Sequence, residues 1–151
     1  MKTVTEMGIK YDSYMYWFMH TQCNFRCEYC FREYGEQNSQ SDGSVSGKHD
    51  TEYICRRFDE TGMRWHIYMT GGEPLLYPNF VELAHALTHQ HYISLSTNLS
   101  TTNAYLLADT IDPLKVINID VSLHIQERNK IPNGFYELVR KLLYFQKKNF
   151  N

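Results

Sequence analysis

The chain alternates four times between a short apolar run and a helical pattern, and this alternation restricts its fold more than any other feature. The four runs, each typical of a buried strand, are residues 14–21 (YMYWFMHT), 65–70 (WHIYMT), 92–97 (YISLST) and 116–123 (VINIDVSL). Strands that alternate with helices usually pair in parallel through right-handed crossovers. The sequence therefore predicts an α/β fold built on one parallel sheet.

Helical patterns follow the runs, and four helices are expected, over about 51–61, 78–87, 100–109 and 133–148. We expect Pro78 in the first turn of the second helix, Ser100 or Thr101 as the cap of the third, and Asn133 as the cap of the last. The apolar spacing gives the expected buried stripes: Ile54 and Phe58; Phe80, Leu83, Ala84 and Leu87; Phe135, Leu138, Val139 and Leu142. The polar segment 35–50 is expected to be a loop.

Composition narrows the class of protein. The 151 residues are enough for one domain, and 42% apolar with 21% charged residues is ordinary for a globular chain. A formal net charge of −2 gives no reason to expect nucleic acid as a partner. The sequence has no run of about eighteen apolar residues that could span a membrane, and its first twenty residues lack a signal-peptide pattern. We therefore expect a cytoplasmic protein.

Three thiols lie close together in TQCNFRCEYCF (21–31), at Cys23, Cys27 and Cys30. They are too clustered for a disulfide framework, and clustered thiols in a reducing compartment more often bind metal or carry out redox chemistry. A closed zinc site needs four ligands, and His20 or Cys55 could supply the fourth. An iron–sulfur cluster is the other possibility. If neither residue closes the site, one metal position is open to a small molecule.

The polar segments after the four runs are expected at one rim, because the carboxyl ends of parallel strands share an edge of the sheet. These segments are TQCNFRCEYC, TGGEP, TNLS and SLHIQE. In TGGEP, Gly71 and Gly72 allow positive φ angles and a close approach to a ligand. Glu73 could bind an ammonium group there. Taken alone, the same five residues also fit a plain strand-to-helix turn.

The combination of motifs resembles the radical S-adenosylmethionine (radical SAM) superfamily. The first expected strand is followed by C-x3-C-x2-C, with Tyr29 before the last cysteine, and the second by Gly-Gly-Glu-Pro. STN (96–98) ends the third strand and VSLH (121–124) the fourth, where many members have Ser-Leu-Asp. The sequence CNFRCEYC is most similar to the molybdenum-cofactor-type and peptide-modifying branches of the superfamily. The resemblance covers residues 14 to 150 and implies a partial (β/α) barrel with four of the usual six strand–helix units.

The resemblance also implies a role for each matching position. Cys23, Cys27 and Cys30 look like the three ligands of a [4Fe–4S] cluster, with S-adenosylmethionine (SAM) on the fourth iron. The residues implied to contact SAM are Tyr29, Gly71, Gly72, Glu73, Pro74, Thr97, Asn98, Ser122 and His124. His124 departs from the family's usual Asp, and its imidazole could hydrogen-bond a ribose hydroxyl or face solvent. No side chain is expected to act as a catalytic residue.

The implied activity is reductive cleavage of SAM to a 5′-deoxyadenosyl radical that abstracts hydrogen from a substrate. The substrate is not specified and could be a small molecule, a peptide or a protein. Flavodoxin or ferredoxin is expected as the external electron donor. The alternatives are a small activase acting on a partner protein, and a non-catalytic module that binds a cluster or zinc. Residues 1–151 are expected to form a single core domain that lacks the family's fifth and sixth strands.

Overall fold

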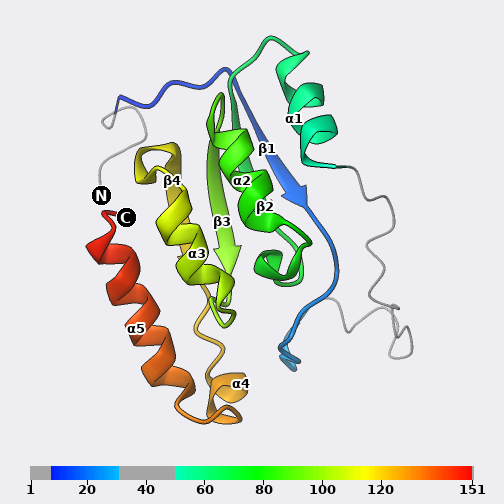
Figure 1. The fold of residues 1–151 in the computed structure, drawn as a ribbon. Helices are drawn as coiled ribbons and strands as arrows, with labels where there is room; N and C mark the ends of the chain where they lie inside the picture. The colour runs from blue at the N-terminus through cyan, green and yellow to red at the C-terminus, as the bar shows by residue number, and fades with distance from the viewer. Residues whose placement is uncertain (1–7, 31–49, 151) are drawn as a thin grey trace.

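The computed structural model describes residues 8–30 and 50–150 and contains one parallel sheet (Figure 1). Its four strands are β1 (Ser13–Phe18), β2 (Trp65–Thr70), β3 (Tyr92–Thr97) and β4 (Val116–Val121). They lie side by side in chain order, and every pair is parallel. The sheet does not close, so the predicted α/β class and partial barrel are confirmed.

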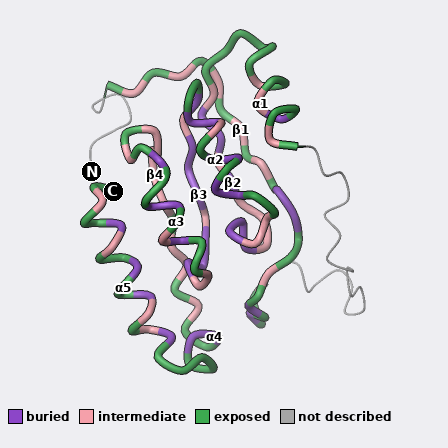
Figure 2. The backbone as a smooth tube through the Cα atoms, in the orientation of Figure 1, coloured by how far each residue is buried: buried purple, intermediate pink, exposed green. Residues whose placement is uncertain are grey.

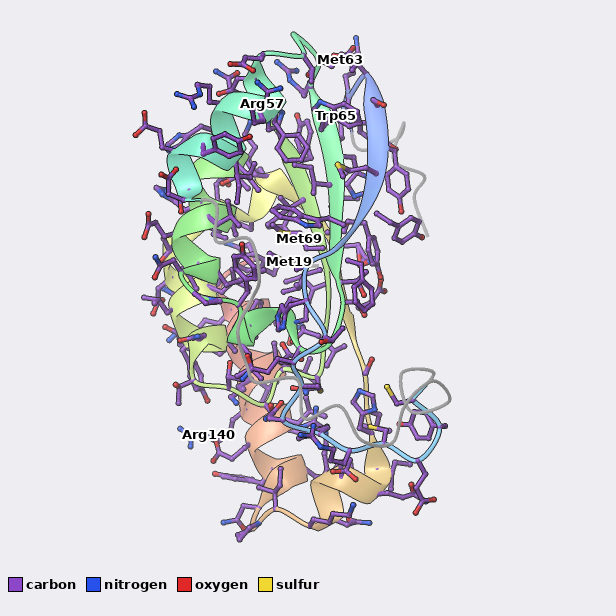
Figure 3. All side chains as sticks on the ribbon, turned by 90° about the vertical axis from the view of Figure 1, so that its right-hand side faces the viewer. Met19, Arg57, Met63, Trp65, Met69 and Arg140 are labelled. Atoms are coloured by element: carbon purple, nitrogen blue, oxygen red, sulfur yellow. The ribbon has the colours of Figure 1, made fainter. Side chains whose placement is uncertain are left out.

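Helices connect the strands and cover one face of the sheet (Figure 1). The α-helices are α1 (Thr51–Asp59), α2 (Phe80–Thr88), α3 (Asn103–Thr110), α4 (Ile125–Asn129) and α5 (Gly134–Lys147). Two short 3-10 helices are η3 (Pro74–Leu76) and η4 (Pro113–Lys115). In Figure 3, which turns the molecule by 90°, α1, α2 and α3 stand to one side of the strands, and Met69 lies between the two layers. Within the described part of the chain, no helix has the length and apolar character needed to cross a membrane.

The hydrophobic core lies between the sheet and α1, α2 and α3. The strands contribute alternate residues, among them Ile67, Met69, Ile93 and Leu95, each at most 1% exposed. The stripe predicted for α2 is confirmed, because Phe80, Leu83, Ala84 and Leu87 are all buried in this core. Burying side chains of this size stabilises the fold by roughly 1.5–3 kcal/mol each. Figure 2 shows the buried residues along β3, the central strand with a neighbour on each side.

The other face of the sheet carries no described helix, and we call it the open face. Side chains alternate between the two faces of a strand, so the register assigns residues to it. The open-face strand residues are Tyr14, Tyr16, Phe18, His66, Tyr68, Thr70, Tyr92, Ser94, Ser96, Asn118 and Asp120. The face is therefore aromatic and polar, whereas the opposite face is mainly apolar and includes Trp17 and Trp65, which pack against the core.

Two helix starts were predicted wrongly. The helix expected from Pro78 begins at Phe80, because Asn79 adopts a left-handed conformation with φ of 56°. The third helix begins at Asn103 after Thr102, and neither Ser100 nor Thr101 is its N-cap. The Ser100 hydroxyl instead accepts a hydrogen bond from Asn24 Nδ2 at 2.7 Å. Ser100 thus contacts the distant cysteine loop instead of capping α3.

The last helix differs more from its prediction. Asn133 occupies the N-cap position, but its side chain makes no capping hydrogen bond. The buried stripe of α5 contains Leu138, as predicted, whereas Val139 is 50% and Leu142 41% exposed. Lys141 is buried in their place because its ammonium group reaches carbonyl groups at the end of β3. The preceding helix α4 was not predicted at all.

Strand and helix ends account for the other differences. The first strand stops at Phe18 rather than residue 21, and β4 stops at Val121 rather than residue 123. Helix α1 ends at Asp59 rather than Thr61, although its predicted face of Ile54 and Phe58 packs on the core as expected. β2 and β3 have the predicted bounds. The loop expected at 35–50 lies outside the described residues except for Asp50, which caps α1.

Candidate functional site

The segments that follow the four strands meet at one rim, at the lower end of the sheet in Figure 1. They enclose a cavity of about 250 Å³. The cavity is lined by Cys23, Phe25, Cys27, Tyr29, Cys30, Thr70, Gly71, Gly72, Ser96, Thr97, Asn98, Ser122 and His124. A second hollow, of about 530 Å³, adjoins it along Tyr29, Ser122 and His124. The structure thus brings together all but two of the predicted site residues, Glu73 and Pro74.

The three cysteines lie on the loop after β1 as thiols that form no disulfide. Cys27 is buried, whereas Cys23 and Cys30 are half-buried. Cys23 Sγ accepts a hydrogen bond from the Phe25 backbone N–H at 3.4 Å, and the Cys30 N–H donates to the Cys27 carbonyl at 3.0 Å. Burial raises the pKa of the Cys27 thiol, so a cation bound there would displace a proton.

His124 lies against the cysteine loop rather than in solvent. Its Nδ1 atom is 2.7 Å from Tyr29 Oη and 3.2 Å from Cys27 Sγ, and its ring stacks on Tyr29. The residue has a φ of 46°, a left-handed conformation that Asp, Asn and His adopt more readily than most residues. Burial lowers the pKa of His124, which favours the neutral ring. A histidine can therefore replace an aspartate here without a change of backbone.

Gly71 and Gly72 join the ends of β1 and β2 by close backbone packing. Gly71 has a φ of 139°, and a Cβ atom there would lie 2.5 Å from the His20 carbonyl oxygen. At Gly72 it would lie 2.0 Å from the Gln22 carbonyl oxygen. The Gly72 N–H donates to the His20 carbonyl at 2.8 Å. Glycine is therefore required at both positions by the neighbouring loop, as well as for any approach of a ligand.

Glu73 is fully buried and directs its carboxylate into the protein. The carboxylate accepts hydrogen bonds from the Thr97 hydroxyl at 2.6 Å, the Asn98 N–H at 2.6 Å and the Leu75 N–H at 3.1 Å. Burial raises the pKa of Glu73, while these donors and the nearby Arg128 oppose that shift. The carboxylate thus joins the loop after β2 to the loop after β3. Pro74 follows as the first residue of η3.

Two buried cations hold the same rim from the other side, and the sequence analysis missed both. Arg128 is 2% and Lys141 4% exposed. Arg128 donates to the carbonyls of Asn98, Ser122 and Leu123, and Lys141 donates to those of Leu99 and Ser100. No local sequence signal marks these residues, because charged residues are usually exposed and their partners after β3, Asn98 and Leu99, lie 30 and 42 residues away in the chain.

An amide network links the cysteine loop to the end of β3. Asn98 Nδ2 donates to Asn24 Oδ1 at 3.0 Å and lies 3.9 Å from Cys23 Sγ. The Ser122 N–H donates to the Thr97 carbonyl at 3.0 Å, which fixes the start of the segment after β4. Thr97, Asn98 and Ser122 are therefore positioned by neighbouring loops as well as by their own strands.

The two residues considered as a fourth metal ligand do not line the cavity. His20 Nδ1 accepts a hydrogen bond from the Gln22 N–H at 3.1 Å, and Cys55 packs in α1 against the core. Among residues 8–30 and 50–150, no three His, Cys, Asp or Glu side chains form a group that could hold one metal ion. A [4Fe–4S] cluster places each cysteine on a different iron and so needs more widely spaced thiols. The three thiols line one cavity, an arrangement that fits the cysteine ligation of such a cluster.

Comparisons with known proteins agree with this geometry. The family model described as the radical SAM superfamily matches residues 17–148. The chain is 34% identical over 112 residues to a probable GTP 3′,8-cyclase of Methanocella arvoryzae, covering 72% of the chain and 33% of that protein. It is 33% identical over 110 residues to a probable GTP 3′,8-cyclase of Saccharolobus solfataricus, covering 71% and 33%. It is 29% identical over 117 residues to a GTP 3′,8-cyclase of Haemophilus influenzae, covering 78% and 33%.

The chain thus spans about a third of the length of these curated relatives. The matched region contains all four strand ends that form the cavity, including the three cysteines and both glycines of the second loop. Members of the matched family bind a [4Fe–4S] cluster and SAM. On the evidence of its fold, its rim and this match, the chain belongs to the radical SAM superfamily.

Proposed function

We propose that the chain forms the cofactor-binding core of a radical SAM enzyme. Cys23, Cys27 and Cys30 would hold the [4Fe–4S] cluster, and SAM would occupy the fourth iron. The observation that carries the proposal is that three thiols and the Gly71–Gly72 backbone line one cavity at the strand ends. When bound, the cluster and SAM supply reductive cleavage to methionine and a 5′-deoxyadenosyl radical, which abstracts hydrogen from the substrate.

The chain's own residues would bind and orient the cofactor. Backbone groups of Gly71 and Gly72 and the side chains of Thr97, Asn98 and Ser122 offer donors and acceptors along one wall. Tyr29 and His124 form the opposite wall, where their stacked rings and those of Phe25 would exclude water. Pro74, the remaining predicted contact, would act through the backbone turn that it begins.

Glu73 would act mainly through the loops that it joins. The resemblance places this residue near the SAM ammonium, and that role remains a prediction. Its carboxylate already accepts three internal hydrogen bonds, two of them from the residues at the end of β3. Glu73 would thus keep the Gly71–Gly72 backbone at a fixed distance from Thr97 and Asn98. Such preorganisation limits the reorganisation needed when a ligand binds.

The partners follow from the chemistry. Reductive cleavage needs a strong one-electron donor, for which we propose flavodoxin or ferredoxin. The cytoplasm is the expected compartment, because free thiols and a reduced donor both require reducing conditions. The substrate is not assigned. An activase of a partner protein and a non-catalytic cluster-binding module remain the alternative functions. The names of the relatives suggest GTP as a candidate substrate.

The test is 5′-deoxyadenosine formation by the 151-residue chain. The protein would be reconstituted anaerobically with iron and sulfide and then given SAM and dithionite, with and without GTP. We expect a brown protein that forms 5′-deoxyadenosine. Cys27→Ala should lose the cluster, whereas the matched Cys55→Ala, on α1, should retain it.

Three further results of this experiment would each have a distinct meaning. A colourless protein that carries zinc after anaerobic purification would overturn the proposal. A cluster without 5′-deoxyadenosine would favour the non-catalytic module or a core that needs further polypeptide. A new product formed only with GTP would identify the substrate suggested by the relatives.

A further inference from the structure

The open face carries a row of aromatic rings beside the cofactor cavity. Tyr14, Tyr16 and Tyr68 form a chain of ring contacts, with centroids 5.1 Å apart for Tyr14–Tyr16 and 4.8 Å for Tyr16–Tyr68. Tyr16 is 67% and Tyr14 42% exposed, although each is a large side chain in a strand. Exposed aromatic rings in contact on an uncovered sheet face are typical of a binding surface.

The row ends at a carboxylate. The Tyr68 hydroxyl donates a hydrogen bond to Asp120 Oδ2 across the small serines of β3, and Asn118 Nδ2 donates to the same oxygen at 3.0 Å. Both bonds therefore fall on one oxygen of an exposed carboxylate. None of the ion pairs found among the described residues involves Asp120. Its charge thus lacks a cationic partner within residues 8–30 and 50–150.

Asp120 supplies a negative charge near the cavity end of the open face, whereas the one described cation against this face, the Lys115 ammonium, lies 5.1 Å from the centroid of the Tyr92 ring at the opposite end of the strands. The open-face strand residues include no Lys or Arg, and Asp120 is the only carboxylate among them. His66 is buried, and burial lowers its pKa, so it adds no positive charge near neutral pH. A tyrosine surface with one unpaired carboxylate attracts a cation both through the ring faces and through direct Coulomb attraction.

The surface is continuous with the cavity. Thr70 and Ser96, which line the cavity, are open-face residues of the neighbouring strands β2 and β3, and Asp120 is the register partner of Ser96. Asp120 lies two residues before Ser122, which also lines the cavity. A group bound between Tyr16, Tyr68 and Asp120 would therefore lie beside a reactive species formed in the cavity.

We propose that the open face binds a positively charged amine of the substrate, with Asp120 as the counter-ion and Tyr16 and Tyr68 as the ring surface. This inference rests on the proposed function, because it assigns a substrate class to the same site. The occupant is an alkylammonium group, whose N–H atoms can donate to Asp120 Oδ1, an oxygen that accepts no hydrogen bond from the described residues. The tyrosine rings suit its aliphatic stem.

The probe is a set of three small molecules with the same carbon skeleton. Isopentylamine is a cation at neutral pH, 3-methylbutan-1-ol is uncharged, and 3-methylbutanoate is an anion. Each would be titrated into the isotope-labelled, cluster-free chain while the backbone amide signals are followed by NMR. We expect the amine to bind at least about fivefold more tightly than the alcohol, the anion to bind most weakly, and the shifted signals to fall on β1, β2 and β4.

Variants identify the counter-ion. Asp120→Asn keeps the shape of the side chain, and we expect it to reduce the affinity for the amine to that for the alcohol. The matched control is Glu82→Gln, which makes the same change of net charge at an exposed position on α2. We expect this control to bind the amine as the unchanged chain does. Equal affinity for all three probes, or unchanged amine binding by Asp120→Asn, would overturn the proposal.

A second variant is used if Asp120→Asn does not fold. The dispersion of its backbone amide signals shows whether it folds. Tyr16→Leu removes an exposed ring, and we expect it to weaken amine binding at least about twofold; full affinity in a folded Tyr16→Leu would contradict the role of the rings. These measurements use the protein without its cluster. Loss of amine selectivity with normal 5′-deoxyadenosine formation would therefore contradict only this inference. Amine selectivity without 5′-deoxyadenosine formation would contradict only the proposed function.

Discussion

Gly72 shows how much of the rim depends on one missing side chain. The loop after β1 passes so close to this residue that its Gln22 carbonyl oxygen would lie 2.0 Å from a Cβ atom. The conflicting atoms belong to the backbone, which cannot rotate away as a flexible side chain can. The loop that carries the cysteines would have to move, and the cavity would change shape with it.

Gly72→Ala is therefore expected to lower the free energy of unfolding by about 3 kcal/mol, the upper part of the range for overpacking. The matched control is Gly62→Ala, at a residue with φ of 66° and no atom within 4 Å of the added methyl group. Its left-handed backbone alone should lower the free energy of unfolding by about 1 kcal/mol. Urea denaturation of both variants measures the difference, and equal losses would show that the loop relaxes around Gly72.

Some residues of the site could be predicted from sequence motifs, whereas others could not. The cysteines, Gly71 and Gly72 have a distinctive spacing, and all of them line the cavity. Phe25, Thr70 and Ser96 also line it; they lie within the motifs CNFRCEYC, TGGEP and STN but were not predicted as site residues. Arg128 and Lys141 were missed because their roles depend on carbonyl groups that lie 30 and 42 residues away at the end of β3. A local pattern cannot show such contacts.

At the scale of the element, α5 is the clearest case of a helix whose orientation depends on its neighbours. The helix packs beside α3, and Leu138 and Phe145 enter the core. Val139 and Leu142 belong to the predicted stripe but are exposed rather than buried in the core. Apolar periodicity therefore predicted the helix correctly but not its buried face.

Substitutions on α5 should reveal this orientation. Leu138→Ala should lower the free energy of unfolding by about 3 kcal/mol, because a buried leucine leaves a cavity. Val139→Ala, the adjacent control, should change it by less than about 0.5 kcal/mol, because this side chain is half exposed. Thermal or urea unfolding of the two variants checks the order, and a larger loss at Val139 would place the predicted stripe in the core after all.

Strands were easier to predict than helix ends. The bounds of β2 and β3 agreed with the sequence because these strands are short apolar runs with clear polar ends. The starts of α2 and α3 did not, because Asn79 turns left-handed and Ser100 binds Asn24 of the cysteine loop. The start of a helix depends on which group a polar side chain hydrogen-bonds. Several such groups are available at each helix start.

At the scale of the whole molecule, two buried histidines connect stability to pH. His66 is 7% and His91 2% exposed, and burial lowers the pKa of both, although Asp59 partly opposes the shift at His91. In the unfolded chain both rings regain an ordinary pKa near 6.5. The unfolded state therefore takes up protons at a higher pH than the folded state does.

The free energy of unfolding should thus be greatest above about pH 6.5 and should decrease as the pH falls below that value. Urea unfolding at about pH 7.5 and 5.5 measures the decrease. His66→Gln should make it smaller, because one of the rings whose pKa is lowered by burial no longer titrates. The same substitution at His85, an exposed residue of α2, serves as the control and should leave it unchanged. An equal decrease in all three proteins would contradict the role of His66.

The order of the strands has a kinetic consequence. Because each strand pairs only with the one before and the one after it in the chain, no strand has to insert between two that are already paired. A chain emerging from the ribosome could add each strand–helix unit to an existing edge as soon as it is synthesised. The four strand ends that form the cavity would then come together in order, and the segment after β4 would complete the wall last.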